Sequence, residues 1–433
     1  MSGNYAAVSA PFHRLDQNDQ NQLLYAGAVF IYENVNGTWQ FSEKIVPNDR
    51  NLVTEFGYSI DMYGDYLVVG APGDKAGLPG QPLLNYAGAV YVYERNSNGT
   101  YQLIEKLVAS QREGSSFLGY SVSIDQTAIA VGAPFHGLDM LNQNFINVSG
   151  AIYIYDFDGS QWNQTQKITA FDRYQGLAFG LDVAVNHNPR ILAVGTKRDE
   201  NGLPLSVVEF DAGAVYVYSD NGFGFANDAK LISPDREYRE GFGCSIDLDD
   251  NYLAVGGRLD QDNMSGVFEV DTAGAVYIYN ANSPSWTFSQ KIISSDREAG
   301  DHFGEDVALS SFDTLGASSY GLLVGAWKED QDIQGSNFME RSGSVYFYGY
   351  TTIGLNEQEV NTLKAYPNPF SQSIHLGSTE ENAELIVLNQ TGQIVVQRRN
   401  PTESINLQEL PAGCYTLQLI ESTGVKSQMI VKQ

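Results

Sequence analysis

The chain has 433 residues, of which 52 are acidic and 25 are basic, so its formal net charge at pH 7 is −27. A chain this acidic is repelled by nucleic-acid phosphates and by anionic lipid headgroups, which argues against both kinds of partner. The 43 glycines and 26 tyrosines favour a turn-rich β protein. The two cysteines, Cys244 and Cys414, are too few for a disulfide framework, and no apolar run has the length of a transmembrane helix.

A short segment made of a glycine, a small residue and a β-rich run recurs six times between residues 26 and 348. Successive glycines are 61, 62, 63, 61 and 69 residues apart, which is too regular for unrelated strands. These glycines are Gly27, Gly88, Gly150, Gly213, Gly274 and Gly343. The period predicts a fold made by repetition of one supersecondary unit.

Further markers keep the same phase in each unit. A lysine follows an aromatic residue by five positions, an arginine follows the lysine by six, and a Phe-Gly or Leu-Gly pair begins six positions later. The lysines are Lys44, Lys106, Lys167, Lys230 and Lys291, and the arginines are Arg50, Arg112, Arg173, Arg236 and Arg297. Because several markers hold one spacing, the units are predicted to share one local structure.

Each unit is predicted to contain four antiparallel strands. In one unit the first strand starts at residues 56–57, the second is the apolar run 67–72, the third is the run 89–93, and the fourth carries Tyr101 and Lys106. Valine and tyrosine alternate along the third strand with the period of two that β structure requires. Asn-Gly or Asp-Gly pairs precede most fourth strands, as is typical of tight hairpins. Repeated units of four strands predict a β-propeller.

The motif Phe56-Gly57, followed fourteen residues later by Gly70-Ala71-Pro72, resembles the FG-GAP repeats of integrin α subunits. The resemblance covers residues 1–350 and implies an all-β propeller with six visible blades. The first blade lacks its Phe-Gly strand, and the N-terminal residues lack the features of a signal peptide. We therefore expect an N-terminally incomplete propeller, and whether a seventh blade precedes it is left open.

Residues 351–365 are predicted to be a linker, and residues 366–433 a small antiparallel β-sandwich. Ordered markers occur along this last segment: Tyr366-Pro367-Asn368-Pro369, then Gly392 after an apolar strand, then Gly413 and Tyr415, and finally Lys432. They resemble the type A C-terminal sorting domain of type IX secretion cargo in Bacteroidetes. The resemblance implies recognition by the type IX machinery, export across the outer membrane, and release or surface attachment. An ordinary accessory sandwich is the alternative.

The sequence offers no recognised catalytic motif. Gly-x-Ser-x-Gly, His-Glu-x-x-His and phosphate-binding glycine loops are all absent from it. His13 and His136 occupy the same place in two repeats, which duplication explains better than catalysis does. We therefore predict neither enzymatic activity nor an organic cofactor.

Calcium is the one metal for which the sequence has a candidate site. Asp247, Asp249 and Asn251 place oxygen ligands at alternate positions, as calcium loops do. Integrin-type loops have glycine and aspartate at the sixth and ninth positions, where this chain has Tyr252 and Val255. Ordinary acidic residues of a hairpin are therefore the preferred interpretation, with calcium as the alternative.

The propeller topology also predicts which face meets a ligand. In a four-stranded blade, the loop between strands two and three lies on the same side as the connection that enters the blade. The two–three loops vary and are polar, so they are the predicted ligand contacts. The candidates are Asp260, Asp262, Asn263, Asp330 and Asp332. The repeated arginines are instead predicted to hold each connection against a carboxylate or main-chain carbonyls.

These observations favour a secreted or outer-surface propeller that binds or adheres to a protein or glycan and is not an enzyme. Two alternatives remain open at this point. The first is a hydrolase, or the non-catalytic part of a multidomain secreted enzyme. The second is a structural surface protein.

Overall fold

The computed structural model describes residues 1–200, 209–262, 270–282, 285–314, 317–330, 342–351, 365, 370–376, 383–389, 394–402, 404–421 and 424–432. Regular structure in these residues is all β, as predicted, and comprises 28 strands in eight sheets. The chain divides into two compact units, one with residues 1–32 and 41–355, the other with residues 33–40 and 356–433. Residues 352–364 of the predicted linker lie outside the described residues.

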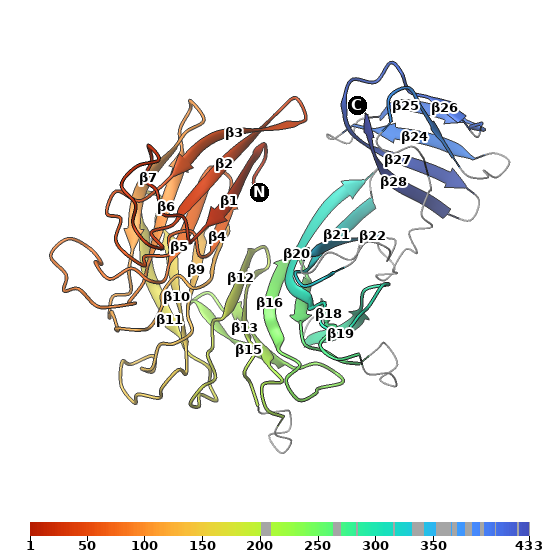
Figure 1. Ribbon diagram of the computed structural model, residues 1–433. Helices are drawn as coiled ribbons and strands as arrows, with labels where there is room; N and C mark the ends of the chain where they lie inside the picture. Colours follow the sequence, from red (N-terminus) through yellow and green to blue (C-terminus); the bar gives the residue numbers. More distant parts are fainter. Residues whose placement is uncertain are drawn as a thin grey trace. The chain divides into compact units, whose positions relative to one another are not determined.

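The six repeats form the six blades of a β-propeller, and the strands of each blade follow one another in chain order (Figure 1). Blade 1 has three strands, β1 (Tyr5–Ala10), β2 (Ala28–Val35) and β3 (Thr38–Ile45). Blade 2 has β4 (Ile60–Tyr63), β5 (Tyr66–Ala71), β6 (Ala89–Arg95) and β7 (Tyr101–Leu107). Blade 3 has β8 (Val122–Ile124), β9 (Ala128–Ala133), β10 (Ala151–Phe157) and β11 (Trp162–Ile168).

The remaining blades repeat this order. Blade 4 has β12 (Asp182–His187), β13 (Arg190–Thr196), β14 (Ala214–Asp220) and β15 (Phe225–Leu231). Blade 5 has β16 (Phe242–Asp249), β17 (Tyr252–Gly257), β18 (Ala275–Asn282) and β19 (Ser285–Ile292). Blade 6 has three strands, β20 (Phe303–Thr314), β21 (Ala317–Ala326) and β22 (Ser344–Thr351). The first strands β4, β8, β12, β16 and β20 pack against one another in series, so the Phe-Gly strands are innermost, as predicted.

The repeating glycine and aromatic residues meet at the junction between blades. Gly213, just before β14, forms a parallel bridge with Phe242, the first residue of β16. Its φ is +91°, and a Cβ there would lie 2.0 Å from the main-chain oxygen of Phe242. The fully buried Phe242 ring packs edge-on against Tyr277, with 5.3 Å between ring centroids. The same bridge recurs at four other junctions, so one geometric requirement explains the period of the sequence.

The third strand of each blade is apolar on both faces because blades cover it on both sides. In β6 the side chains of Val90 and Val92 join a core with blade 3 that includes Tyr153. Tyr91 and Tyr93 point to the opposite face and pack with residues of blade 1. Burial of both faces is the reason that valine alternates with tyrosine rather than with a polar residue.

The smaller unit contains two sheets around one core. Strand β23 (Ser373–His375) pairs with β26 (Ser404–Asn406). The second sheet has the order β25 (Ile394–Arg399), β24 (Glu384–Leu388), β27 (Gly413–Glu421) and β28 (Gly424–Lys432). Ile374 and Ile405 from the first sheet share a buried core with Leu385 and Leu417 from the second. This is the predicted antiparallel sandwich.

Within the described residues, no helix has the length and hydropathy needed to cross a membrane.

Candidate functional site

The side of the propeller that carries the two–three loops is called the loop face here. Its described residues are the loops 11–27, 72–88, 134–150, 197–200 with 209–213, 258–262 with 270–274, and 327–330 with 342–343, and the connections 46–59, 108–121, 169–181, 232–241 and 293–302. Because strands alternate in direction, the hairpins between strands three and four lie at the opposite end of each blade. Among the described residues of the propeller, the loop face therefore gathers the longest irregular segments.

A buried polar cluster recurs on this face in blades 2, 4 and 5. In blade 4 the Tyr216 hydroxyl lies 2.7 Å from Asp172 and 3.0 Å from Asp199. The Lys230 ammonium donates to the same two carboxylates at 2.7 and 2.8 Å. Asp172 belongs to the entering connection and Asp199 to the loop between β13 and β14. The cluster therefore ties both loops to the third and fourth strands of the blade.

Blades 2 and 5 repeat this arrangement with their own residues. The corresponding sets are Tyr91, Lys106, Asp49 and Asp74 in blade 2, and Tyr277, Lys291, Asp235 and Asp260 in blade 5. Burial lowers the pKa of Lys291, but Asp260 and Asp235 outweigh it and raise that pKa above its ordinary value. The lysine is therefore held charged between two carboxylates, which balances their charge within the blade.

The five repeated arginines make the contact that was predicted for them. Nη2 of Arg236 donates to the main-chain oxygen of Asp199 at 2.9 Å, and Nη1 donates to the main-chain oxygen of Gly213. Nη2 of Arg236 also lies 3.3 Å from the Asp199 carboxylate. The other four donate to main-chain oxygens of the matching loop: Arg50, Arg112, Arg173 and Arg297. Each arginine thus fastens the connection that leaves a blade to the two–three loop of that blade.

We expect Arg236→Ala to lower the free energy of unfolding by about 1–3 kcal/mol, because buried carbonyl and carboxylate oxygens would lose a charged donor. Thermal unfolding of the full chain, followed by circular dichroism, would measure the change. Arg198→Ala is the matched control, since Arg198 is exposed on the loop that Arg236 contacts. An Arg236→Ala protein that melts together with the parent would contradict the structural role.

Blades 1 and 3 have a histidine in place of the loop aspartate. His136 is fully buried, its Nδ1 lies 2.9 Å from Glu113, and its ring meets Tyr153 edge-on at 5.9 Å. His13 meets Phe30 in the same way at 5.5 Å. Burial lowers the pKa of both histidines. Neutral rings packed on aromatic side chains fit the structural interpretation given to this repeated position.

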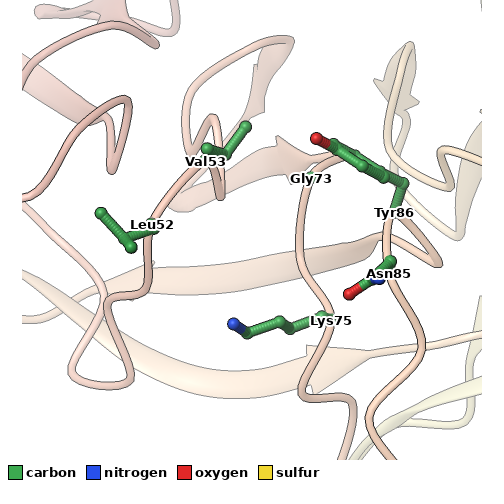
Figure 2. A pocket seen from close by; sticks show the side chains of 6 residues that line it. All are labelled: Leu52, Val53, Gly73, Lys75, Asn85 and Tyr86. Atoms are coloured by element: carbon green, nitrogen blue, oxygen red, sulfur yellow. The ribbon is translucent and has the colours of Figure 1, made fainter.

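A small pocket opens on the loop face of blade 2 (Figure 2). It encloses about 190 Å³ and is lined by Leu52, Val53, Gly73, Lys75, Asn85 and Tyr86. The first two come from the connection that enters the blade, and the other four from the loop between β5 and β6. The pocket thus combines apolar walls with an ammonium group, an amide and an aromatic ring. The sequence analysis did not find it, because its lining residues are not the markers that recur in every repeat.

Five segments of the chain match the model of the FG-GAP repeat: residues 39–93, 101–155, 162–218, 225–279 and 286–348. The chain belongs to the FG-GAP repeat family. Integrin alpha-6 of Gallus gallus is 31% identical over 99 residues, which are 22% of this chain and 9% of the integrin. The match to this curated relative therefore spans well under two thirds of the relative's length. The predicted resemblance to integrin-type propellers is confirmed.

Residues 364–433 of the FG-GAP protein match the secretion system C-terminal sorting domain. The predicted sorting domain is therefore confirmed, and it implies recognition by the type IX secretion machinery. The FG-GAP protein is accordingly secreted or attached to the outer cell surface.

The structure describes part of the sorting motif. The hydroxyl of Tyr415, on β27, donates to the Pro411 carbonyl at 2.8 Å, and the ammonium of Lys432, on β28, donates to the Ser371 carbonyl. Gly413 begins β27. Tyr415 and Lys432 therefore join the ends of strands to neighbouring segments of the sandwich. The other motif residues lie outside the described residues: Tyr366, Pro367, Asn368, Pro369 and Gly392.

The prediction that Asp260 contacts a ligand is wrong. Its side chain is 0% exposed and is bound by Tyr277, Lys291 and Arg297. The first acidic residue of this loop turns inward because strands three and four and the outgoing connection all present donors to it. Asp262 and Asp330 are half-buried, and Asn263 and Asp332 lie outside the described residues.

Two residues of the calcium candidate, Asp247 and Asp249, join blades 5 and 6 of the FG-GAP propeller, and Asn251 bonds within blade 5. Asp247 accepts hydrogen bonds from the main-chain nitrogens of Leu248, at 2.8 Å, and Leu309, at 2.6 Å. Asp249 accepts one from Ser311, also on β20. The Asn251 carbonyl accepts one from Ala281 at 2.8 Å. These contacts fit the preferred interpretation, in which the acidic residues are structural.

Among the described residues, the acidic groups close enough to share a cation are Asp235, Glu240 and Asp260. Lys291 already lies between the two aspartates, at 2.6 and 2.8 Å. Its ammonium supplies the positive charge that a metal ion would bring, so this donor set does not call for a metal.

Proposed function

We propose that this protein is a non-enzymatic binding propeller that acts outside the cell and contacts its partner through the loop face. The observation that carries the proposal is that the recurring polar side chains of the loop face contact one another. In blades 2, 4 and 5 the recurring aspartates, tyrosines, lysines and arginines of this face bind one another and hold the loops. These recurring groups are therefore occupied in supporting the surface.

The loop face also exposes side chains of another kind. Large apolar residues point outward there, and they differ from blade to blade, as ligand contacts do. Leu83 on blade 2 is 67% exposed and Leu141 on blade 3 is 75% exposed. Others on the same face are Phe12, Phe145 and Phe171. Exposed apolar groups gathered on one face support a binding surface.

Binding can be tested with the immobilised full chain against a panel of glycans and extracellular proteins, measured by surface plasmon resonance. We expect saturable binding of at least one member, and a loss of roughly tenfold or more in the Leu83→Ser, Leu141→Ser double variant, because each exposed anchor contributes about 1 kcal/mol or more. Both side chains are exposed, so the fold should be unaffected.

The control is Phe223→Ser, which alters a 99% exposed side chain in the hairpin at the opposite end of blade 4. It should bind like the parent. Absence of saturable binding across the panel would contradict the proposal. Conversion of a bound ligand into product would also contradict it, because the protein would then be an enzyme.

A further inference from the structure

The pocket of blade 2 contains a lysine with an unusual environment. The chain has twice as many acidic as basic residues, and Lys106 of the same blade lies between two aspartates. Within the described part of the chain, the half-buried Lys75 ammonium has no carboxylate or other hydrogen-bond partner. Figure 2 shows the Lys75 side chain extending across the pocket toward Leu52. An ammonium left unpaired in so acidic a protein is available to an anionic group of a ligand.

One apolar wall of the pocket is held in a costly conformation. Val53 has a φ of +59°, in the left-handed region that β-branched residues avoid. The same repeat position also has positive φ elsewhere, where two blades use a glycine: Ser115, Gly176, Arg239 and Gly300. Blade 2 thus has a β-branched residue in a backbone conformation that is unfavourable for it. In this conformation Val53 forms an apolar wall of the pocket that Lys75 also lines.

Tyr86 supplies an aromatic wall. Its side chain is 38% exposed, and its ring stacks on Phe117 with centroids 5.1 Å apart and an interplanar angle of 16°. Phe117 in turn contacts Phe135 at 4.9 Å. The tyrosine ring is thereby fixed from behind by a row of aromatic side chains. A fixed, partly exposed ring suits stacking against the apolar face of another ring.

The main chain around the pocket is largely occupied. The Gly73 nitrogen donates to Thr54 at 3.2 Å, and the Asn85 oxygen accepts from Ser115 at 2.8 Å. The Lys75 oxygen accepts from Arg112 at 2.9 Å. An extended peptide is usually held by main-chain pairing, for which few groups are left here. The pocket instead offers side chains: an ammonium, an amide and an aromatic ring.

We propose that this pocket binds a carboxylate-bearing sugar residue of an acidic polysaccharide, an inference that rests on the proposed binding function of the loop face. Lys75 pairs with the sugar carboxylate, the Asn85 amide binds ring hydroxyls, and the sugar ring lies against Tyr86 between the apolar walls. The pocket is smaller than the roughly 300 Å³ of sites that enclose a whole small molecule. It therefore takes one unit of a chain whose remaining units lie along the face.

Blade 1 carries a second pair of the same type at the equivalent positions. The Arg14 guanidinium lies 5.8 Å from the centre of the Tyr25 ring. The Leu24 carbonyl accepts from Val53 at 2.8 Å, so the blade 1 loop adjoins the pocket. In blades 4 and 5 the position of Lys75 is taken by Glu200 and Gln261. At this repeat position the basic side chains are therefore Arg14 and Lys75, in two adjoining blades, where a polymer with repeated carboxylates meets both.

Isothermal titration calorimetry of the full chain with tetragalacturonate tests the inference. We expect binding that falls by roughly tenfold or more in Lys75→Met, since a charge-assisted contact is worth about 1.5–3 kcal/mol. Lys75→Arg should retain most of the affinity, and Tyr86→Ala should lose it. The matched control is Gln261→Met, at the equivalent position of blade 5, which should bind like the parent.

Two further probes separate the outcomes. The fully methyl-esterified tetrasaccharide should bind much more weakly, and equal binding would overturn carboxylate recognition. An oligoglutamate peptide that binds as tightly as the saccharide, and equally through Lys75, would overturn the assignment to a sugar. If the saccharide fails to bind while another panel member binds through Leu83 and Leu141, this inference fails and the proposed function stands. If no panel member binds either, both fail.

Discussion

Gly213→Ala is expected to lower the free energy of unfolding of the propeller by about 2–5 kcal/mol, the combined cost of a left-handed backbone and an overpacked contact. Gly213 has a φ of +91°, and an added Cβ would lie 2.0 Å from the main-chain oxygen of Phe242. The obstacle is backbone, which no side-chain rotation can remove. The Phe242 nitrogen also donates to Ala212 at 2.8 Å, so the two segments cannot separate without losing this bond.

Gly222→Ala separates the two causes. Gly222 has a similar φ of +87°, but an added Cβ there would meet nothing within 4 Å. This control should lose only the backbone part, about 1–2 kcal/mol. Urea unfolding of both variants, followed by intrinsic fluorescence, gives the comparison. Equal losses in the two variants would show that the blade junction does not require the glycine.

The junction explains why the fold could be predicted from the sequence. The same contact between blades recurs along the repeats. At one junction it is made by Gly213, Phe242 and Tyr277, and packing at the contact restricts each of these positions to its residue type. Substitution at any of them is costly, so the residue types persist at constant spacing. The repeated arginines were interpreted correctly for the same reason, since an invariant distance to neighbouring strands indicates an internal contact.

The candidate site was predicted less well because its geometry depends on residues far apart in the sequence. Asp260 and Asp262 look alike in a polar loop, and only the donors of Lys291 and Arg297 draw the first of them inward. Carboxylates at alternate positions, such as those of Asp247 and Asp249, are found both in calcium loops and on one face of a β-strand. The pocket of blade 2 forms where two loops meet. The residues of these loops that line the pocket are not among the markers shared by all repeats.

Glu240 is expected to make the propeller less stable as the pH rises from about 5 to about 8. It is buried at the loop face of blade 5, where burial and then the charge of Asp260 raise its pKa from 4.5 to about 8. Its Oε2 accepts hydrogen bonds from the Ser233 hydroxyl and the Glu237 nitrogen. The equivalent position is uncharged in blades 2 to 4, which have Thr54, Ser116 and Leu177.

The sign follows from proton counting. Between pH 4.5 and 8 the folded protein keeps the Glu240 proton that the unfolded chain has released, so stability decreases as the pH rises. The contribution of Glu240 to the free energy of unfolding is complete below the pKa that its carboxyl has in the unfolded chain. That contribution is lost as the pH rises through the pKa of the same carboxyl in the folded protein. One pKa unit corresponds to about 1.4 kcal/mol, so the loss amounts to a few kcal/mol in this range.

Glu240→Gln keeps the size of the side chain and removes its titration. Urea unfolding at pH 5, 6, 7 and 8 should show the variant close to the parent at pH 5 and more stable than the parent by a few kcal/mol at pH 8. Asp301→Asn alters the equivalent position of blade 6, where burial raises the pKa to about 6. The difference in free energy of unfolding between Asp301→Asn and the parent should grow between about pH 4 and 6 and stay constant above that. If the curves of Glu240→Gln and the parent are parallel from pH 5 to 8, Glu240 is already ionised in the folded protein.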